Sequence, residues 1–469
     1  MRKLLFLFSF AISCFALKAQ ESSIKLQSEK ADYYDYEDDF LPAAFHRERR
    51  DSLRALLPDS TAAVFFSAPE RNRANDVYYE YHQDPNFYYL TGLREPNSLV
   101  VIFKEPIFFQ GKETSEMVFV QERNPQTEIW NGRRLGVEGA KQNLGIQTVL
   151  GNATFKELDL PFNSLKRVYF QQPYALEDQS IKESNTLKGL VHYFEEKVDT
   201  TSEIAESHLA MMMAQLRQVK TEEELKLLRK AINITCEAQN ELMKQITDEM
   251  TEYQTEAIIE YVFKRNGAEY PGFPSIQGSG ENSCILHYTS NRRPLKNGGL
   301  LVSDVGAEYH GYTADVTRTI PPDGKFSKEE KKIYELVLKA QNAGIEAAQI
   351  GNSFWAPHQA AQKVIAEGLK KLGLIKKDSE VRKYFMHGTS HYLGLDVHDA
   401  GMYMALDAGN VITVEPGIYI AEESDCDPKW WNIGVRIEDD ILIREEGPEN
   451  LSADSPRTVS EIEALMEQE

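Results

Sequence analysis

Four acidic residues lie inside or at the end of strand-like apolar runs in the C-terminal half of the chain. Asp304 and Asp315 belong to Leu-Leu-Val-Ser-Asp-Val-Gly and Gly-Tyr-Thr-Ala-Asp-Val-Thr, and His310-Gly311 between them is a turn signal. Glu415 ends the run Val-Ile-Thr-Val-Glu, and Glu438 follows Val-Arg-Ile. Aspartate is disfavoured in strands, and buried carboxylates repel one another unless positive charge compensates them. A fold that buries these strands must therefore supply such charge.

Two divalent cations would balance the four negative charges in the simplest way. Oxygen ligands joined by one imidazole suit manganese, iron, cobalt or zinc better than calcium. Each aspartate could instead cap a backbone turn. Arg436 and Glu438 fall on one strand face, opposite Val435 and Ile437, so an Arg–Glu ladder at the surface is the alternative for that pair.

Residues 384–399 carry three histidines in Tyr-Phe-Met-His-Gly-Thr-Ser-His-Tyr-Leu-Gly-Leu-Asp-Val-His-Asp. His391 and His398 are seven residues apart with Gly394 between them, which argues against a metal-binding face on one helix. With His387, they indicate the lining of a pocket, and the alternative is a polar loop. Because His391 is close in sequence to the acidic strands, it is the candidate imidazole ligand.

The first residues have the layout of a secretory signal peptide. Arg2 and Lys3 precede an apolar run over residues 4–17, and a small residue, Ala19, provides a cleavage point. The run is too short to span a bilayer, so we expect an exported protein, periplasmic or secreted. Lipid modification of Cys14 is a minor alternative.

The chain is acidic, with a formal net charge of −21, and removal of residues 1–19 takes away three positive charges and no negative one. Such a charge disfavours nucleic acids and anionic membrane surfaces as partners. Three scattered cysteines remain, Cys236, Cys284 and Cys426, and they make no disulfide framework.

Pattern changes predict an acidic lead-in over 20–58 and two domains. Residues 59–202 alternate short strands with helix-like stretches, which predicts a three-layer α/β domain. Residues 203–469 begin with long helices, and helices alternate with strands, which predicts an α+β domain. Within it, two helices followed by a pair of carboxylate-bearing strands occur twice. Capping signals at Thr221, Thr251 and Ser327 predict three helix starts, the last helix running to Gly351, and Ser353 a fourth.

These motifs resemble the Xaa-Pro aminopeptidases (aminopeptidase P) of the pita-bread metallopeptidases. The likeness runs from about residue 60 to 465. It rests on Gly-Ser-Gly-Glu-Asn-Ser-Cys-Ile-Leu-His287-Tyr, His-Gly-x-Ser-His-x-x-Gly-x-Asp-Val-His-Asp, Val-Glu-Pro-Gly and Arg-Ile-Glu-Asp, in that order. Tyr-Leu-Thr-Gly at 89–92 and Gln-Thr-Glu-Ile-Trp-Asn-Gly-Arg-Arg-Leu-Gly at 126–136 extend it into the N-terminal domain. Departures include the loop 422–432, so preference at the subsites stays open.

The resemblance implies a pita-bread catalytic domain with two metal ions, most often manganese. Asp304 would hold one ion, His391 and Glu415 the other, and two carboxylates would bridge them, Asp315 and Glu438. It also implies catalytic roles for His287 and His398 near the scissile carbonyl, for Glu415 as general base and for Arg436, and a place for His387 on the proline-side wall.

The implied reaction is hydrolysis of the N-terminal Xaa-Pro bond in peptides with proline in second position, by a chain expected to form homo-oligomers. An Xaa-Pro dipeptidase, which shares the ligands but requires a free carboxylate next to proline, is the nearest alternative. A non-catalytic peptide-binding domain would lack metal ligands, and creatine-type hydrolases on this fold need no metals. The complete ligand set disfavours both.

Overall fold

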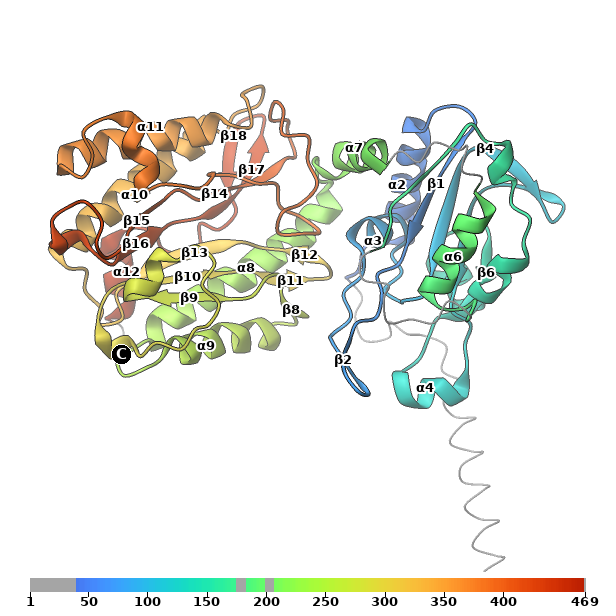
Figure 1. Cartoon of the computed structure of the whole chain (residues 1–469), viewed down its shortest axis with the longest axis horizontal. Helices are drawn as coiled ribbons and strands as arrows, with labels where there is room; N and C mark the ends of the chain where they lie inside the picture. Colours follow the sequence, from blue (N-terminus) through green and yellow to red (C-terminus); the bar gives the residue numbers. More distant parts are fainter. Residues whose placement is uncertain (1–38, 174–182, 199–205, 468–469) are drawn as a thin grey trace, which may run out of the picture. The chain divides into compact units, whose positions relative to one another are not determined.

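The computed structural model describes residues 39–173, 183–198 and 206–467 (Figure 1). The chain divides into two compact units between Met213 and Ala214. The predicted signal peptide, Cys14 and the first part of the lead-in lie outside the described residues. Within the described ranges, no helix combines the length and the apolar character needed to cross a bilayer.

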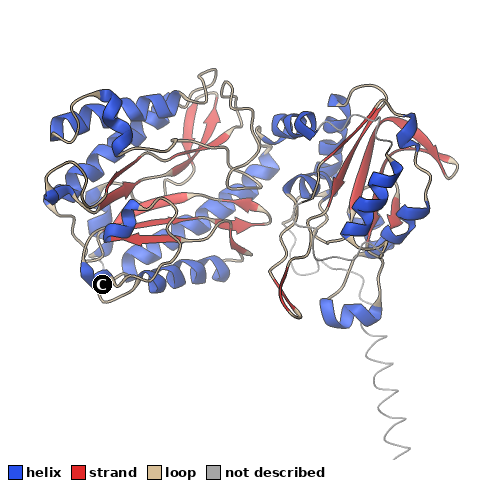
Figure 2. Cartoon of the chain, viewed as in Figure 1, coloured by secondary structure: helices blue, strands red, loops and turns tan. Residues whose placement is uncertain are grey.

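The N-terminal unit is built on a five-stranded sheet in the order β6-β5-β4-β1-β7 (Figures 1 and 2). Strand β1 pairs antiparallel with β4 and parallel with β7. The helices and strands of this unit are α2 (Ala43–Leu56), β1 (Thr61–Phe66), β2 (Asn72–Ala74), β3 (Val77–Tyr78), α3 (Pro85–Thr91), β4 (Leu99–Phe109), β5 (Lys112–Val120), α4 (Pro125–Asn131), α5 (Gly136–Asn143), β6 (Val149–Gly151), β7 (Arg167–Phe170), α6 (Leu187–Lys197) and α7 (Glu206–Arg217), which crosses the boundary.

Helices cover both faces of this sheet. Alternate residues of β1, such as Val64 and Phe66, belong to the same core cluster as Phe194 of α6. Helices α2 and α3 contact the sheet at β4 and β1. Because side chains of a strand alternate between the two faces, the fully buried β1 requires cover on both sides. The three-layer α/β prediction is confirmed.

The lead-in prediction was wrong for its last part, because α2 lies inside the range 20–58. Phe45 and Leu53 of this helix are buried, and Arg50 bonds the buried Glu116 of β5 with Nε and Nη2. The segment His-Arg-Glu-Arg-Arg-Asp is so charged that its sparse apolar positions gave no clear helical period. The ion pair compensates a charge that the fold has buried.

The C-terminal unit holds four long helices and small antiparallel sheets. Helix α8 packs on strands β11 to β13, and α10 packs on β14 to β16 (Figure 1). The elements are α8 (Glu222–Gln245), α9 (Glu252–Arg265), β8 (Tyr270–Pro271), β9 (Ile276–Ser279), β10 (Leu301–Val305), β11 (Ala307–Tyr309), β12 (Tyr312–Thr313), β13 (Val316–Ile320), α10 (Lys328–Ala347), α11 (Ala356–Leu372), β14 (Val411–Val414), β15 (Gly417–Ile420), β16 (Ile433–Arg436), β17 (Asp439–Arg444), β18 (Gly447–Asn450) and α12 (Val459–Met466).

Three of the predicted helix starts are confirmed. Thr221, Thr251 and Ser327 each accept a hydrogen bond from the backbone N–H three residues later, in complete capping boxes. The predicted end of the third helix at Gly351 was wrong, because α10 already ends at Ala347. The predicted fourth helix is present, but it begins at Ala356 and not at Ser353. Ser353 instead forms an isolated β-bridge with Ala405, and a proline lies in the first turn of α11.

The predicted repetition is present in the order of elements. Helices α8 and α9 precede the carboxylate-bearing strands β10 to β13, and α10 and α11 precede β14 to β17. The turn at His310-Gly311 joins β11 to β12, with φ of 49° and 85° at its two residues. Both values fit the tight hairpin that the sequence predicts. Cys236, Cys284 and Cys426 are free cysteines.

Candidate active site

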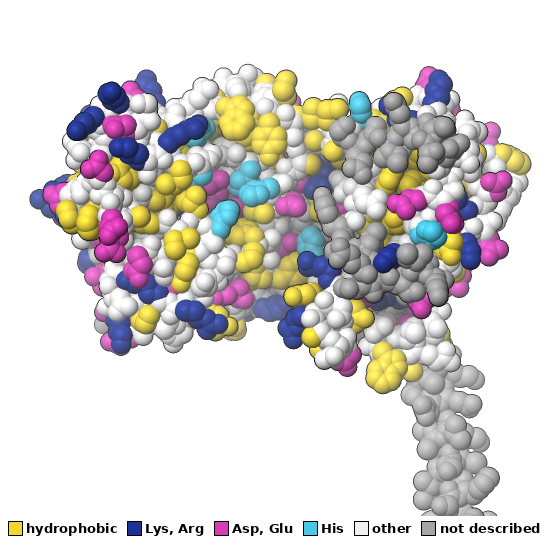
Figure 3. Space-filling view, viewed as in Figure 1, with side chains coloured by type: hydrophobic (Ala, Val, Ile, Leu, Met, Phe, Trp, Pro, Cys, Tyr) yellow, Lys and Arg dark blue, Asp and Glu magenta, His cyan; other side chains and the backbone are white. Residues whose placement is uncertain are grey.

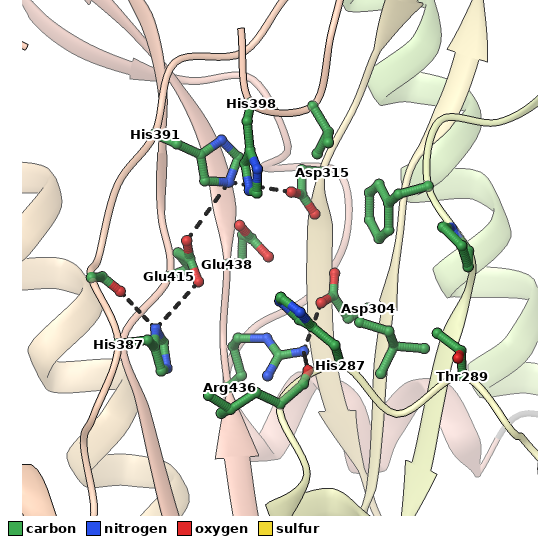
Figure 4. A pocket seen from close by; sticks show the side chains of 16 residues that line it. His287, Thr289, Asp304, Asp315, His387, His391, His398, Glu415, Arg436 and Glu438 are labelled. Carbon is green, nitrogen blue, oxygen red and sulfur yellow. Dashed lines mark hydrogen bonds and ion pairs between the residues drawn. The ribbon is translucent and has the colours of Figure 1, made fainter. Parts of the chain in front are cut away.

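All nine predicted site residues line one cavity of about 550 Å³ in the C-terminal unit. Histidine side chains gather on the drawn face of this unit (Figure 3). The carboxylates and imidazoles point toward a common space (Figure 4). The predicted residues in the lining are His287, Asp304, Asp315, His387, His391, His398, Glu415, Arg436 and Glu438.

The four acids lie at or near the ends of strands that border this cavity. Asp304 lies in β10 opposite Thr317 of β13, and Asp315 comes directly before β13. Gly306 keeps the two strands close, because a Cβ added there would lie 1.7 Å from the carbonyl oxygen of Ala314. Glu415 follows β14, and Glu438 lies between β16 and β17. Residues more than a hundred positions apart thus converge at one point.

The imidazole of His391 faces two of the acids through Nε2. This atom lies 3.4 Å from Asp315 Oδ2 and 3.7 Å from Glu415 Oε1. On the other side of the ring, Nδ1 lies 3.1 Å from the carbonyl oxygen of Tyr392. A carbonyl can only accept, so Nδ1 carries the proton and the Nε2 lone pair is available to a metal ion.

The donor set fits cations. Asp304 Oδ1 and Asp315 Oδ1 are buried, and neither accepts a hydrogen bond within the described part of the chain. One ligand atom from each of Asp315, His391 and Glu438 lies within 4.8 Å of the others. Buried carboxylate oxygens without donors cost free energy unless a cation satisfies them. The residues therefore fit a divalent metal site.

Burial and mutual repulsion make these acids hard to ionise. Burial first, and then Asp304, Asp440 and Glu415, raise the pKa of Asp315 well above its usual range. Burial and the neighbouring acids do the same to the pKa of Glu438, and burial raises the pKa of Glu415 to about 7. Bound cations would favour the charged forms and reverse these shifts.

Arg436 supplies positive charge to one edge of the cluster. Its Nη2 lies 2.6 Å from Asp304 Oδ2, and its side chain is 5% exposed. Glu438 is also buried and accepts a 2.6 Å hydrogen bond from Thr317 Oγ1. The surface Arg–Glu ladder is therefore wrong, because both side chains point into the cavity.

His387 forms part of a hydrogen-bonded chain that leads through Tyr419 to Arg436. Its Nδ1 donates to the carbonyl of Gly388 at 2.6 Å, and its Nε2 lies 2.9 Å from the hydroxyl of Tyr419. Arg436 Nη1 donates to the same hydroxyl at 2.9 Å. Burial lowers the pKa of His387 to about 4, so Nε2 accepts from the hydroxyl.

The loop that carries His391 and His398 is fixed at its end by Asp399. The backbone N–H of Asp399 donates to the carbonyl of Tyr392 at 2.9 Å. Its carboxylate pairs with Arg217 and, at 2.8 Å, with Lys220. Although burial opposes ionisation, these two cations hold the pKa of Asp399 below its usual range. The ring centroids of His391 and His398 are 4.5 Å apart.

Comparisons with known proteins identify the family. The model of metallopeptidase family M24 matches residues 226–445, and that of the aminopeptidase P N-terminal domain matches residues 46–165. Xaa-Pro aminopeptidase of Escherichia coli is 37% identical over 90% of this chain and 97% of its own. This chain belongs to the M24 metallopeptidases of the Xaa-Pro aminopeptidase family.

Solved structures confirm the pita-bread fold of this M24 metallopeptidase. Aminopeptidase P from E. coli with the inhibitor Pro-Leu matches with a TM-score of 0.81 and 34% identity, over 91% of this chain and 98% of that one. Proline aminopeptidase P II from Yersinia pestis matches with a TM-score of 0.80 and 36% identity, over 91% and 99% of the chains.

Xaa-Pro aminopeptidase 3 of mouse is 33% identical over 89% of this chain and 84% of its own.

Sequence interpretation missed three polar residues at the M24 site, and one of them, Thr289, lies in the cavity lining. Tyr419 joins His387 to Arg436, and Thr317 bonds Glu438. Thr317 could have been found by strand alternation, because it is two residues after Asp315. Tyr419 could not, because Glu415 and Pro416 separate β14 from β15. The apolar part of the lining was missed as well, although two of its residues, Leu286 and Val397, lie inside quoted motifs: Phe273, Pro274, Ile276, Leu286 and Val397.

Proposed function

We propose that this metallopeptidase hydrolyses the bond between an N-terminal residue and a following proline, and releases the first residue. The observation that carries the proposal is the convergence of Asp315, His391 and Glu438 in a cavity shared with Asp304 and Glu415. The names of the relatives support the substrate class, and the E. coli structure was obtained with an inhibitor that begins with proline.

The five ligands are assigned to two divalent ions. Asp304, Asp315, His391, Glu415 and Glu438 would together hold these ions. The buried donor-free Oδ1 atoms and the Nε2 lone pair of His391 support this assignment. Manganese is the proposed metal because the family resemblance implies it, and mixed oxygen and imidazole ligands are compatible with this ion. A zinc-substituted E. coli relative is among the matching structures, so another divalent ion can occupy the site of that protein.

The protein groups divide the work of hydrolysis. When bound, the ions supply Lewis-acid chemistry, which activates a water molecule and polarises the scissile carbonyl. Glu415 accepts the proton of the attacking water as general base. His398 and His287 donate hydrogen bonds to the developing oxyanion, since an imidazole carries at least one N–H in either protonation state. Arg436 holds Asp304 in place.

The leaving group is the proline nitrogen, which must gain a proton before it departs. A carboxyl group of the cavity or a water molecule supplies this proton. His387 contributes to the wall on the proline side, and the chain from Arg436 through Tyr419 fixes its ring. A ring held at both nitrogens gives the proline a rigid surface to contact.

A small peptide panel tests the reaction. We expect release of the first residue from an Xaa-Pro-Yaa-Yaa peptide and a kcat/KM about 10- to 100-fold lower when alanine replaces the proline, because the wall contacts the ring. Release is measured by chromatography of the products.

The Xaa-Pro dipeptide serves as the discriminating substrate in the same panel. An Xaa-Pro dipeptidase would prefer the dipeptide over the tetrapeptide. Preference for the dipeptide, or indifference to proline, would contradict the proposal.

Export and self-association are further proposals for this metallopeptidase. The basic start, apolar run and Ala19 support cleavage of a signal peptide, and the expectation of homo-oligomers follows the family resemblance. We expect the mature chain from cells to begin at Gln20 and to elute from a sizing column as more than a monomer. Intact-mass measurement and light scattering check the two points. A retained Met1, or a lipid on Cys14, would refute soluble export.

A further inference from the structure

The carboxylate of Glu252 lies at the start of α9, outside the cavity lining, and is fully buried. Its Oε1 accepts three hydrogen bonds. They come from the backbone N–H of Ser279 at 2.7 Å, from the hydroxyl of Ser279 at 2.8 Å and from Asn282 Nδ2 at 3.1 Å. Three donors on one oxygen are more than a helix start requires, because Thr251 already caps α9.

The second oxygen binds the other end of the same segment. Glu252 Oε2 accepts from the hydroxyl of Tyr288 at 2.9 Å and from the backbone N–H of Arg293 at 2.8 Å. The backbone N–H of Glu252 donates to the carbonyl of Arg293 at 3.0 Å. One carboxylate therefore ties together the two ends of residues 279–293.

This segment carries His287 into the cavity. Leu286, His287 and Thr289 line the cavity, and the carbonyl of Leu286 accepts a 3.4 Å hydrogen bond from Arg436. The His287 ring is exposed, and no hydrogen bond within the described part of the chain fixes it. Its position therefore depends on the backbone at either side, and Glu252 fixes that backbone.

We propose that Glu252 is a positioning residue for His287 in the reaction. It touches no substrate, and it acts by holding residues 279–293 so that the imidazole reaches the oxyanion. The inference rests on the proposed function, because it assigns His287 a task in hydrolysis. It predicts that the hydrogen-bonding pattern of this carboxylate matters as well as its volume.

Glu252→Gln tests this with little change in size. The amide oxygen can serve the donors at one end of the segment, but the amide NH2 then faces N–H and O–H donors at the other end. Glu256→Gln is the matched control, one turn later on α9, because Glu256 accepts only one hydrogen bond from the segment, from Asn291 at 3.0 Å. We expect kcat to fall about 10- to 100-fold in Glu252→Gln with little change in KM, and both constants to stay within about twofold in the control.

A double-mutant cycle separates positioning from general destabilisation. If Glu252 acts through His287, adding Glu252→Gln to His287→Ala lowers kcat by less than about twofold more. A purely structural role would lower activity by the same factor in both backgrounds. Additive losses, or a Glu252→Gln variant as active as the wild type, would overturn the proposal.

A second readout does not depend on the reaction. The amide of the Arg292–Arg293 bond is the one that donates to Glu252, so trypsin should cut this bond faster in Glu252→Gln than in the wild type or in Glu256→Gln. We call the hydrogen bonds from residues 279–293 to Glu252 the tether. If the wild type fails to cleave proline-second peptides while trypsin still cuts the Arg292–Arg293 bond faster in Glu252→Gln, the proposed function is wrong but the tether is supported. Equal cutting in all three proteins would refute the tether.

Tyr288→Phe provides a milder variant if Glu252→Gln does not fold. It removes only the hydroxyl that donates to Oε2. We expect a smaller fall in kcat, about 2- to 5-fold, with faster tryptic cutting at Arg292. Unchanged kcat and unchanged cutting would count against the proposal.

Discussion

Replacing Glu415 with alanine is expected to lower kcat at least about a thousandfold while the protein stays folded. General bases alone contribute about 10²- to 10⁴-fold, and Glu415 is also a proposed ligand. It follows β14, and its Oε1 and Oε2 face His391 and His387 at 3.7 and 3.5 Å. Removing the side chain leaves the proton of the attacking water without an acceptor. Steady-state kinetics on a proline-second peptide measures the loss.

Glu415→Gln separates the two tasks of this residue. Glutamine keeps an oxygen that can face an ion but cannot accept the water proton, so we expect its kcat to fall nearly as far with more metal retained. Glu446→Gln, an exposed position on the β17–β18 turn, serves as the control and should match the wild type. Circular dichroism and metal content are measured for each protein. Unchanged kcat in either Glu415 variant would reject its assignment.

Removing metal with a chelator is expected to reduce activity to background, and adding Mn²⁺ is expected to restore it. Without cations, Asp304, Asp315, Glu415 and Glu438 face one another in a buried space, with Arg436 compensating only the first of them directly. Charged groups so placed either bind protons or repel. We expect about two ions per chain in the active form.

Thermal unfolding gives a measure of metal binding that is independent of turnover. A ligand that binds only the folded state stabilises it by about 2.7 kcal/mol at a hundredfold excess over its Kd. Mn²⁺ should therefore raise the Tm of the chelated protein, and Ca²⁺, which suits an imidazole ligand poorly, should raise it less. Full activity at undetectable metal content, or a Tm indifferent to Mn²⁺, would refute the metal assignment.

Local signals predicted much of the structure. Capping boxes at Thr221, Thr251 and Ser327 were readable because their hydrogen bonds join residues three apart. The predicted helix start at Ser353 was wrong, because Ser353 forms a β-bridge with the distant residue Ala405. Helix α2 was missed because charged residues dominate its sequence, and only the buried Glu116 explains why Arg50 can lie inside.

The sequence by itself determined the chemical types at the site and their order along the chain. Acids within β-branched strands, together with histidines in a glycine-containing loop, indicate cation binding, because burying uncompensated carboxylates costs free energy. The tertiary structure alone decided which groups meet. It paired Arg436 with Asp304, joined Tyr419 to His387, and placed Glu252 in hydrogen-bonding contact with residues 279–293, which carry His287. These contacts span up to 132 residues of chain and depend on strand register and loop path, which no local pattern encodes.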